Sequence, residues 1–396
     1  MTIMKTNLAV IFGCRSVEHE VSIISAVQAM HSVDTEKYNI VPLYVTKTGE
    51  TYTGADMLSI EEFKDIPALL GKSHPVSLVR EGDTVKVKFL DNKIFRKNGD
   101  IPLDVALPVV HGTNCEDGTI AGLLEFLGLP YVGCDILSAA VGMDKTVFKD
   151  VLSAAGLPVL PCVKFTAREY TAKKDEIIAK IKEKCGLPAI VKPVNLGSSI
   201  GISKADNEKE LEEAISLAVS FSDKILVEKA IENLREINCS VLGDCDNAIA
   251  SVCEEPFMHD KILSYEDKYM GNSGSKGMAS LGRQLPADIP ENASNKIRKL
   301  SVDIFKAIGA SGVVRIDYLL NAKTGEIYAN EINTIPGSLS FYLWEATGVK
   351  YQELLDRLVD LAFRRQRNRD NLTFTINSNI LSGVSFGSKG SKGSKI

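Results

Sequence analysis

Two runs of β-branched and aromatic residues in the C-terminal part of the chain constrain its fold more than any other feature. Residues 313–320 and 326–333 flank a short segment, 321–325, that contains Asn and Gly. These two residue types tolerate the positive φ angle that a tight turn between antiparallel strands requires. The pattern therefore predicts a β-hairpin in which each run forms one strand.

Four polar side chains are expected on this hairpin. Because strand side chains alternate, Arg315 and Asp317 share one face of the first strand, and Glu331 and Asn333 share one face of the second. If the turn pairs the strands near Thr324, Asp317 lies opposite Glu331. Two carboxylates and an amide carbonyl beside an arginine form an all-oxygen site for a divalent cation that holds phosphates. A solvated strand face is the alternative, but the flanking residues are apolar, and half-buried like charges are costly without a cation.

The length and composition indicate an ordinary globular protein. A chain of 396 residues predicts about two or three domains. Its 46 basic and 51 acidic residues leave a net charge of -5, which gives no electrostatic case for binding nucleic acid. Eight cysteines without a C-x-x-C pair fit reduced thiols in a cytoplasmic protein. No segment approaches the roughly 20 apolar residues of a membrane span. We therefore expect small-molecule chemistry.

The first 132 residues have the pattern of a doubly wound α/β domain. A short apolar strand at 7–12 is followed by a polar loop and by residues 21–30 with helical spacing, which is the first half of a βαβ unit. Further elements are expected as buried strands at 39–45 and 105–110, a helix at 118–127, and a strand of an edge hairpin at 84–90.

The rest of the chain divides into two more α/β regions and a tail. Residues 133–227 begin with a helix at 145–155 and predict a lid-like α+β domain, and residues 228–382 predict a second α+β domain that ends with the hairpin. The other expected elements are strands at 159–165, 189–192, 225–228, 236–242 and 247–254, and helices at 173–184, 207–219 and 293–308. Residues 383–396 repeat Gly, Ser and Lys and are expected to be flexible.

A second motif, at residues 192–201, has the composition of a phosphate-binding loop. Lys192 ends an apolar strand and is followed by Gly197, Ser198, Ser199 and a further glycine. Glycines and small hydroxyl residues in a row expose backbone N–H groups that can hold phosphate. The lysine precedes the glycines, so this is not a Walker A loop, and no G-x-G-x-x-G follows the first strand. Together with the carboxylate hairpin, the loop favours a nucleoside triphosphate site.

These motifs and several others resemble those of the D-alanine–D-alanine ligases, a family of the ATP-grasp superfamily. The resemblance extends over nearly the whole chain and follows the order of the family motifs. It includes FGCRSVEHEVS at 12–22, HGTNCEDG at 111–118, MDK at 143–145, the glycine-serine loop, YEDKY at 265–269, RID at 315–317 and NEINTIPG at 330–337. The resemblance implies a three-domain ATP-grasp fold, with ATP held between the central and C-terminal domains.

The resemblance also implies an activity. Members of this family join two D-alanines to D-alanyl-D-alanine for peptidoglycan precursors, using ATP and forming an acyl phosphate. We therefore expect ATP, two Mg²⁺ ions that Mn²⁺ can replace, D-alanine as substrate and a cytoplasmic homodimer. The residues expected to bind ATP are Lys145 and Lys192 at the phosphates, Lys268 at the γ-phosphate, Gly197, Ser198 and Ser199 in the loop, Glu228 at the adenine edge and Glu236 at the ribose hydroxyls.

The reacting groups are implied in the same way. Asp317, Glu331 and Asn333 would hold the metal ions, and Arg315 and the backbone N–H of Gly337 would meet the oxyanion of the tetrahedral intermediate.

The first D-alanine is expected to bind near the N-terminal domain. Glu18 would pair with its ammonium group and form a hydrogen-bonded triad with Ser198 and Tyr269 that closes the loops over the reaction. Closure matters because water hydrolyses an exposed acyl phosphate. His111 precedes a loop at the carboxyl end of a strand, where α/β proteins bind ligands. Glu18 could instead be a helix N-terminal carboxylate, and His111 a buried structural histidine.

One segment departs from the family pattern. After Pro-Gly, the family commonly has a Ser that helps to bind the carboxylate of the second substrate, whereas Tyr342 stands at that position here. Ser340 is the candidate substitute, so both residues are expected in the second-substrate pocket. Sibling ligases that make D-alanyl-D-serine or D-alanyl-D-lactate remain alternatives.

Two more distant functions are alternatives. A biotin-dependent carboxylase shares ATP-grasp parts but uses bicarbonate. A regulator that only binds nucleotide would not need the arginine of the reaction face, so the presence of Arg315 together with the metal-site residues argues against it.

Overall fold

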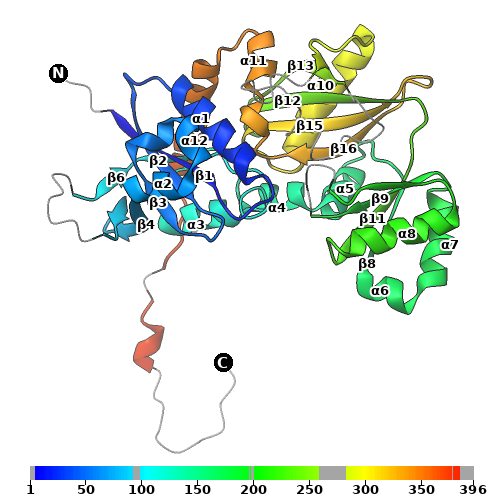
Figure 1. Ribbon diagram of the computed structural model, residues 1–396, viewed down its shortest axis with the longest axis horizontal. Helices are drawn as coiled ribbons and strands as arrows, with labels where there is room; N and C mark the ends of the chain where they lie inside the picture. The colour runs from blue at the N-terminus through cyan, green and yellow to red at the C-terminus, as the bar shows by residue number, and fades with distance from the viewer. Residues whose placement is uncertain are drawn as a thin grey trace, which may run out of the picture.

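The computed structural model describes residues 5–91, 99–195, 197, 200–257, 282–376 and 378–383. These residues form three sheets with their helices (Figure 1). The N-terminal domain, the central domain and the C-terminal domain each contain one sheet. This mixed α/β architecture confirms the expected fold class.

The N-terminal sheet has seven strands in the order β6-β5-β4-β3-β2-β1-β7. Strand β1 (Thr6–Gly13) lies between β2 (Tyr38–Val45) and β7 (Val105–Pro108) and is parallel to both, with α1 (His19–Ser32) as the crossover. The other strands are β3 (Thr51–Thr53), β4 (His74–Glu81), β5 (Thr84–Phe89) and β6 (Ile101–Leu103), all paired antiparallel. The doubly wound pattern is therefore limited to the three parallel strands, and β6, not β5, is the edge.

Short helices complete this domain. They are η1 (Ala55–Leu58), η2 (Ile60–Lys64), α2 (Ile66–Lys72) and α3 (Thr119–Leu127), and the next helix, α4 (Ile136–Met143), buries Ala139 in the core of the C-terminal domain. At the end of β1, Gly13 has a φ of 87°, and a methyl group on it would lie 2.4 Å from the carbonyl oxygen of Val45. Only glycine fits there. The chain can thus turn from β1 toward the start of α1.

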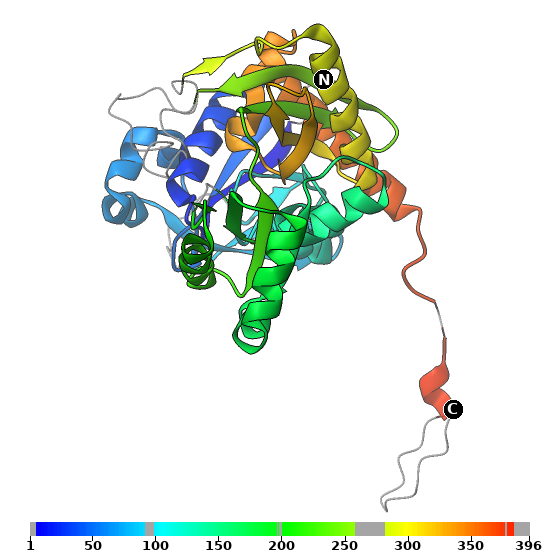
Figure 2. The ribbon, with the colours of Figure 1, turned by 90° about the vertical axis from the view of Figure 1, so that its right-hand side faces the viewer.

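The central domain has an antiparallel sheet in the order β10-β9-β11-β8. Its strands are β8 (Cys162–Thr166), β9 (Ala189–Pro193), β10 (Ser203–Ala205) and β11 (Lys224–Lys229), and its helices are α6 (Ala167–Ala172), α7 (Lys174–Lys184) and α8 (Glu208–Val219). The helices cover one face of the sheet (Figure 2). The strand expected from 159 begins only at Cys162, because Val159 pairs with Ala329 of the C-terminal sheet instead.

The C-terminal domain has a five-stranded antiparallel sheet in the order β14-β13-β12-β15-β16. Its strands are β12 (Leu234–Gly243), β13 (Ala248–Pro256), β14 (Arg283–Gln284), β15 (Gly312–Asn321) and β16 (Ile327–Asn333). Helix α10 (Glu291–Ala307) packs on one face. Beyond the hairpin follow η4 (Gly337–Ser340), α11 (Phe341–Ala346), α12 (Tyr351–Asp370) and η5 (Ile380–Gly383).

Helices α5 (Lys145–Ala154) and α12, like α4, pack with a different domain from the one that their sequence position suggests. Helix α5 buries Phe148 and Leu152 in the core of the C-terminal domain. Helix α12 buries Leu354 and Leu358 in the core that surrounds β1 and α1, and Figure 1 shows it beside α1. Sequence boundaries therefore do not coincide with the boundaries of the hydrophobic cores.

Some features concern the whole chain. All eight cysteines are free, and seven of them are buried, with Cys245 as the exposed one. Among the residues that the structure describes, no helix has the length and hydropathy to span a membrane. Residues 371–376 and 378–382 are exposed and extend away from the three domains (Figures 1 and 2). The Gly-Ser-Lys repeat after them lies outside the described residues.

Candidate active site

Four polar residues form a row across one face of the C-terminal sheet. Asp317 of β15 is directly opposite Glu331 of β16, as the sequence predicts, and opposite Asn238 of β12 on its other side. Asn238 in turn faces Glu254 of β13. Directly opposed residues of antiparallel strands project to the same face. Three carboxylates and one amide therefore line up across four strands.

Each carboxylate of this row is paired with a cation. Lys145 Nζ lies 3.2 Å from Glu331 Oε2, at the start of α5. The guanidinium of Arg315 donates from Nε and Nη2 to the two oxygens of Asp317, both at 2.7 Å. Arg283 Nη1 lies 3.1 Å from Glu254 Oε2. These pairs explain how three carboxylates can share one partly buried face.

The pairing between Arg315 and Asp317 changes the acidity of both groups. Burial raises the pKa of Asp317, Arg315 opposes this effect, and the carboxylates of Glu331 and Glu254 raise it further. Burial lowers the pKa of Arg315, but the carboxylate of Asp317 outweighs burial and raises this pKa well above its usual range. The carboxylates of this face are therefore close enough to interact with one another as well as with Arg315.

The donor set fits a hard divalent cation. Asp317 and Glu331 supply carboxylate oxygens from opposed strands, and Asn333 adjoins them by donating from Nδ2 to Asp317 Oδ2 at 3.1 Å. Within the described ranges, no three His, Cys, Asp or Glu side chains cluster as metal ligands would. The candidate site consists of two carboxylates and an amide, which are oxygen ligands of the kind that Mg²⁺ prefers.

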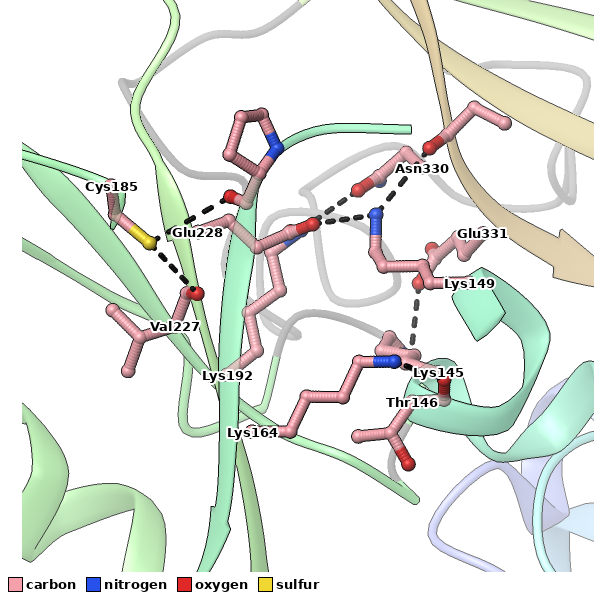
Figure 3. Close-up of polar contacts among 12 residues, drawn as sticks. Lys145, Thr146, Lys149, Lys164, Cys185, Lys192, Val227, Glu228, Asn330 and Glu331 are labelled. Carbon is pink, nitrogen blue, oxygen red and sulfur yellow. Dashed lines mark hydrogen bonds and ion pairs between the residues drawn. The ribbon is translucent and has the colours of Figure 1, made fainter. Parts of the chain in front are cut away.

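A buried ion triad lies next to this site (Figure 3). The fully buried carboxylate of Glu228 (β11) lies between Lys149 (α5) at 2.5 Å and Lys192 (β9) at 2.6 Å. Burial raises the pKa of Glu228, but the two lysines outweigh it and lower the pKa to about 2. Lys192 also donates to Asn330 Oδ1 at 2.7 Å, which links the central sheet to β16.

Lys192 is surrounded by carboxylates. Although burial lowers its pKa, Glu228, Glu331 and Glu236 raise it. Glu236 is half-buried on β12. The predicted nucleotide residues Lys145, Lys192, Glu228 and Glu236 thus come together from α5, β9, β11 and β12, at the junction of the central and C-terminal domains. The Glu228 carboxylate itself forms ion pairs with Lys149 and Lys192.

The Pro-Gly loop that contains Gly337 is fixed to the N-terminal domain by His111. Its Nδ1 lies 2.8 Å from the carbonyl oxygen of Ile335, and its Nε2 lies 2.8 Å from Ser25 Oγ. A carbonyl only accepts, so Nδ1 carries the proton and Nε2 accepts from Ser25, which in turn accepts from Ser338 N at 2.9 Å. Burial lowers the pKa of His111, consistent with a neutral ring. Both nitrogens therefore bind protein groups.

Glu116 adds a second clamp to the same loop. One of its oxygens accepts from Ile335 N at 3.0 Å and the other from Gly112 N at 2.7 Å. Burial and the neighbouring Glu18 raise the pKa of Glu116 to about 8, although its two backbone hydrogen bonds lower it. The loop after β7 and the Pro-Gly loop are thus held together by one carboxyl group.

Glu18 lies where three loops meet. It is 8% exposed at the start of α1. A methyl group on Gly112, which has a φ of 74°, would lie 2.9 Å from Glu18 Oε2, and one on Gly197 would lie 3.4 Å from it. The glycines therefore let the carboxylate approach both the loop after β7 and the glycine-serine loop. Ser198, Ser199, Lys268 and Tyr269 lie outside the described residues.

The segment after Gly337 has unusual geometry. Ser338, Leu339 and Ser340 have φ angles of 50°, 52° and 51°, which is rare for residues other than glycine. The Ser340 side chain is fully buried, and its hydroxyl has no partner among the described residues. Tyr342 donates to Glu254 Oε1 at 2.9 Å. Of the two predicted second-substrate residues, Tyr342 thus contacts the carboxylate row.

Two protein-family models together match most of the chain. The model of the D-ala D-ala ligase N-terminus family matches residues 7–134, and that of the D-ala D-ala ligase C-terminus family matches residues 151–360. The chain belongs to the D-alanine–D-alanine ligase family. The resemblance carried by the sequence motifs is therefore confirmed.

Individual family members match over nearly their full length. A D-alanine–D-alanine ligase from Thermosipho melanesiensis is 41% identical over 378 residues, covering 95% of this chain and 98% of the relative. The D-alanine–D-alanine ligase structure from Coxiella burnetii aligns with a TM-score of 0.77 and 29% identity, covering 92% of this chain and 96% of that one. The VanG D-Ala:D-Ser ligase from Enterococcus faecalis aligns with a TM-score of 0.76 and 32% identity, covering 91% and 100%.

In this member of the family, four residues of the site were missed by sequence reasoning. Lys149 follows Lys145 by one helical turn, and that spacing could have indicated a shared face. Glu116 lies inside a recognised motif, but nothing in the motif assigns its contacts. Glu254 and Arg283 become visible only through strand register, because they lie far from the hairpin in sequence.

Proposed function

We propose that this chain is an ATP-dependent D-alanine–D-alanine ligase of peptidoglycan precursor synthesis. The observation that carries the proposal is Asp317 opposite Glu331, with Arg315 beside them and the lysines of the domain junction next to them. This arrangement suits the transfer of a phosphoryl group to a carboxylate followed by acyl transfer to an amine. Membership of the family supports it.

Nucleotide binding is assigned to the junction of the central and C-terminal domains. Lys145 and Lys192 bind phosphate oxygens, and Glu228 acts through Lys192, which it holds in place. Glu236 takes the ribose hydroxyls, and Lys268 and the glycine-serine loop close over the γ-phosphate. Asp317, Glu331 and Asn333 hold Mg²⁺, or Mn²⁺ in its place. When bound, the metal supplies positive charge that offsets the charge of the transferring phosphoryl group.

The first D-alanine binds with its ammonium group at Glu18. Its carboxylate attacks the γ-phosphate, ADP leaves, and an acyl phosphate forms. The ammonium group of the second D-alanine loses a proton to solvent, the resulting amine attacks the acyl carbon, and the nitrogen releases a second proton to the departing phosphate as the amide forms. Arg315 and the N–H of Gly337 bind the oxyanion, and phosphate leaves as the intermediate collapses. His111 and Glu116 position the Pro-Gly loop for this step, while Ser198 and Tyr269 join Glu18 to exclude water.

The proposal also includes the dipeptide product, the oligomeric state and the cellular location of the enzyme. With Tyr269 and not a histidine in the closing loop, the amine of D-alanine is favoured over the hydroxyl of D-lactate. The chain works as a homodimer in the cytoplasm. D-Alanyl-D-serine synthesis is the alternative that a specific observation supports, because one of the similar structures is a D-Ala:D-Ser ligase.

One experiment separates these possibilities. Phosphate release is measured with ATP and each of D-alanine, L-alanine, D-serine, D-lactate and bicarbonate, and products are identified by mass. We expect D-alanine-dependent release and D-alanyl-D-alanine. Turnover that requires bicarbonate, or a pool dominated by a D-alanyl-D-serine or D-alanyl-D-lactate product, would contradict the proposal.

A further inference from the structure

We infer that Arg283 binds the carboxylate of the second D-alanine, and that Glu254 and Tyr342 position its guanidinium. This inference rests on the proposed function, because a second amino acid must enter the site. It concerns the part of the pocket where this chain has Tyr342 in place of the serine common in the family.

Among the described residues, Glu254 and Tyr342 contact the guanidinium of Arg283. Its Nη1 pairs with Glu254 Oε2 at 3.1 Å, and its guanidinium carbon lies 3.9 Å from the centre of the Tyr342 ring. Stacking on an aromatic ring and pairing with a carboxylate fix a guanidinium plane. Only 13% of the Arg283 side chain is exposed. Such an arginine is preorganised, so little side-chain entropy is lost when a ligand binds.

Glu254 is a buried carboxylate whose two oxygens both accept hydrogen bonds. It is 2% exposed, and its Oε1 accepts from Tyr342 at 2.9 Å and from Asn238 Nδ2 at 3.1 Å, while its Oε2 takes Arg283. A buried carboxylate with this many donors orders the groups around it. It holds both Tyr342 and Arg283, which come from α11 and β14.

The position of the cluster formed by Arg283, Glu254 and Tyr342 indicates which ligand it binds. Glu254 and Tyr342 both act electrostatically on Arg315, the residue assigned to the oxyanion. From Asp317, Glu331 lies toward one end of the carboxylate row, and Asn238 and Glu254 lie toward the other. The phosphates occupy the Glu331 end, so the attacking amine approaches from the Glu254 end. One carbon separates the amine of an amino acid from its carboxylate, which therefore arrives near Arg283.

The chemistry of the cluster suits this ligand. A guanidinium has five N–H donors, so one arginine can bind Glu254 and a substrate carboxylate together. The negative charge of Glu254 also favours a zwitterion over a ligand that carries only negative charge. The expected ligand is thus a small α-amino acid with a free carboxylate.

Competition between D-alanine and D-alaninamide as second substrate tests the inference. The amide lacks the carboxylate charge but keeps the amine, so the ratio of D-alanyl-D-alanine to D-alanyl-D-alaninamide measures carboxylate recognition independently of total activity. We expect Arg283→Gln to lower this ratio by about 10- to 100-fold, as for loss of a hydrogen bond to a charged group. Arg283→Lys should retain part of the preference. Calorimetric affinity for an ATP analogue should not change.

The matched control is Arg235→Gln. Arg235 pairs with Glu255, the next residue of β13, and so loses the same kind of ion pair on the other face of that strand. Its product ratio should equal that of the wild type. Because Arg283→Gln leaves Glu254 unpaired, the double variant Glu254→Gln/Arg283→Gln is included, and its ratio should fall as well.

The outcomes distinguish the inference from the function on which it rests. If the wild-type chain makes D-alanyl-D-alanine but the folded Arg283 variants keep its product ratio, Arg283 does not bind the carboxylate. If the wild-type chain makes no dipeptide, the proposed function itself is wrong. A fall in ratio confined to Arg283 variants supports the inference, and an equal fall in Arg235→Gln would overturn it.

Discussion

Replacing Lys149 by Met should destabilise the protein by about 3 kcal/mol. The methionine keeps the length and apolar stem of the side chain but removes the charge that pairs with Glu228 at 2.5 Å. The carboxyl pKa of about 2, against an ordinary 4.5, corresponds to about 3 kcal/mol of stability at neutral pH, supplied by the two lysines. Breaking a buried pair from one side costs about as much, because the remaining charge stays buried.

The pH dependence of this contribution has a definite sign. The pKa of Glu228 is depressed in the folded state, so its contribution is complete above about pH 4.5 and is lost as the pH falls toward 2. The difference between wild type and Lys149→Met in urea denaturation should therefore be largest near neutral pH and should shrink in acid.

The control for this measurement is Lys164→Met. Lys164 also pairs with a residue of α5, Asp150, but that carboxylate is 73% exposed. Exposed pairs contribute roughly 0–1 kcal/mol, so this variant should unfold close to the wild-type midpoint. If Lys149→Met unfolds at the same urea concentration as Lys164→Met, the triad does not stabilise the domain junction and the reasoning fails.

Three further predictions concern the site. Asp317→Asn or Glu331→Gln should lower turnover by at least about 100-fold with folding intact, because each removes charge that binds the metal; near-normal kcat at saturating Mg²⁺ would exclude the hairpin as the metal site. Lys192→Ala should weaken calorimetric binding of an ATP analogue while leaving D-alanine binding at Glu18 intact, and unchanged nucleotide affinity with unchanged rate would remove Lys192 from the phosphate site. Because the pKa of Glu116 is raised to about 8, stability should fall as pH rises from about 4.5 and level off above 8. Glu116→Gln should flatten that slope in denaturation series, and an identical slope would contradict the assignment.

Local sequence patterns identified most of the elements because strand and helix periodicity are properties of neighbouring residues. The hairpin is the clearest example, since Asp317 and Glu331 are directly opposed as expected from the position of the turn. The motifs likewise identified the family. Both kinds of signal lie within short, continuous stretches of sequence.

Contacts between distant segments could not be predicted in this way. His111 binds Ile335 across 224 positions, and Tyr342 binds Glu254 across 88. Whether Glu228 faces a nucleotide or two lysines depends on how α5, β9 and β11 pack, and no local pattern encodes that. The same reason explains why the strand predicted to start at 159 begins later, because Val159 pairs with a strand of another domain.

The packing of α12 against the first domain has a consequence for the order in which the chain folds. Leu354, Leu355 and Leu358 share one hydrophobic core with Leu8 and Phe12. During synthesis, the first 132 residues leave the ribosome long before these leucines are made. Until then, apolar surface on the first domain stays uncovered. The N-terminal domain therefore completes its core only after nearly the whole chain has emerged, and a chain truncated before residue 351 should leave that domain prone to aggregation.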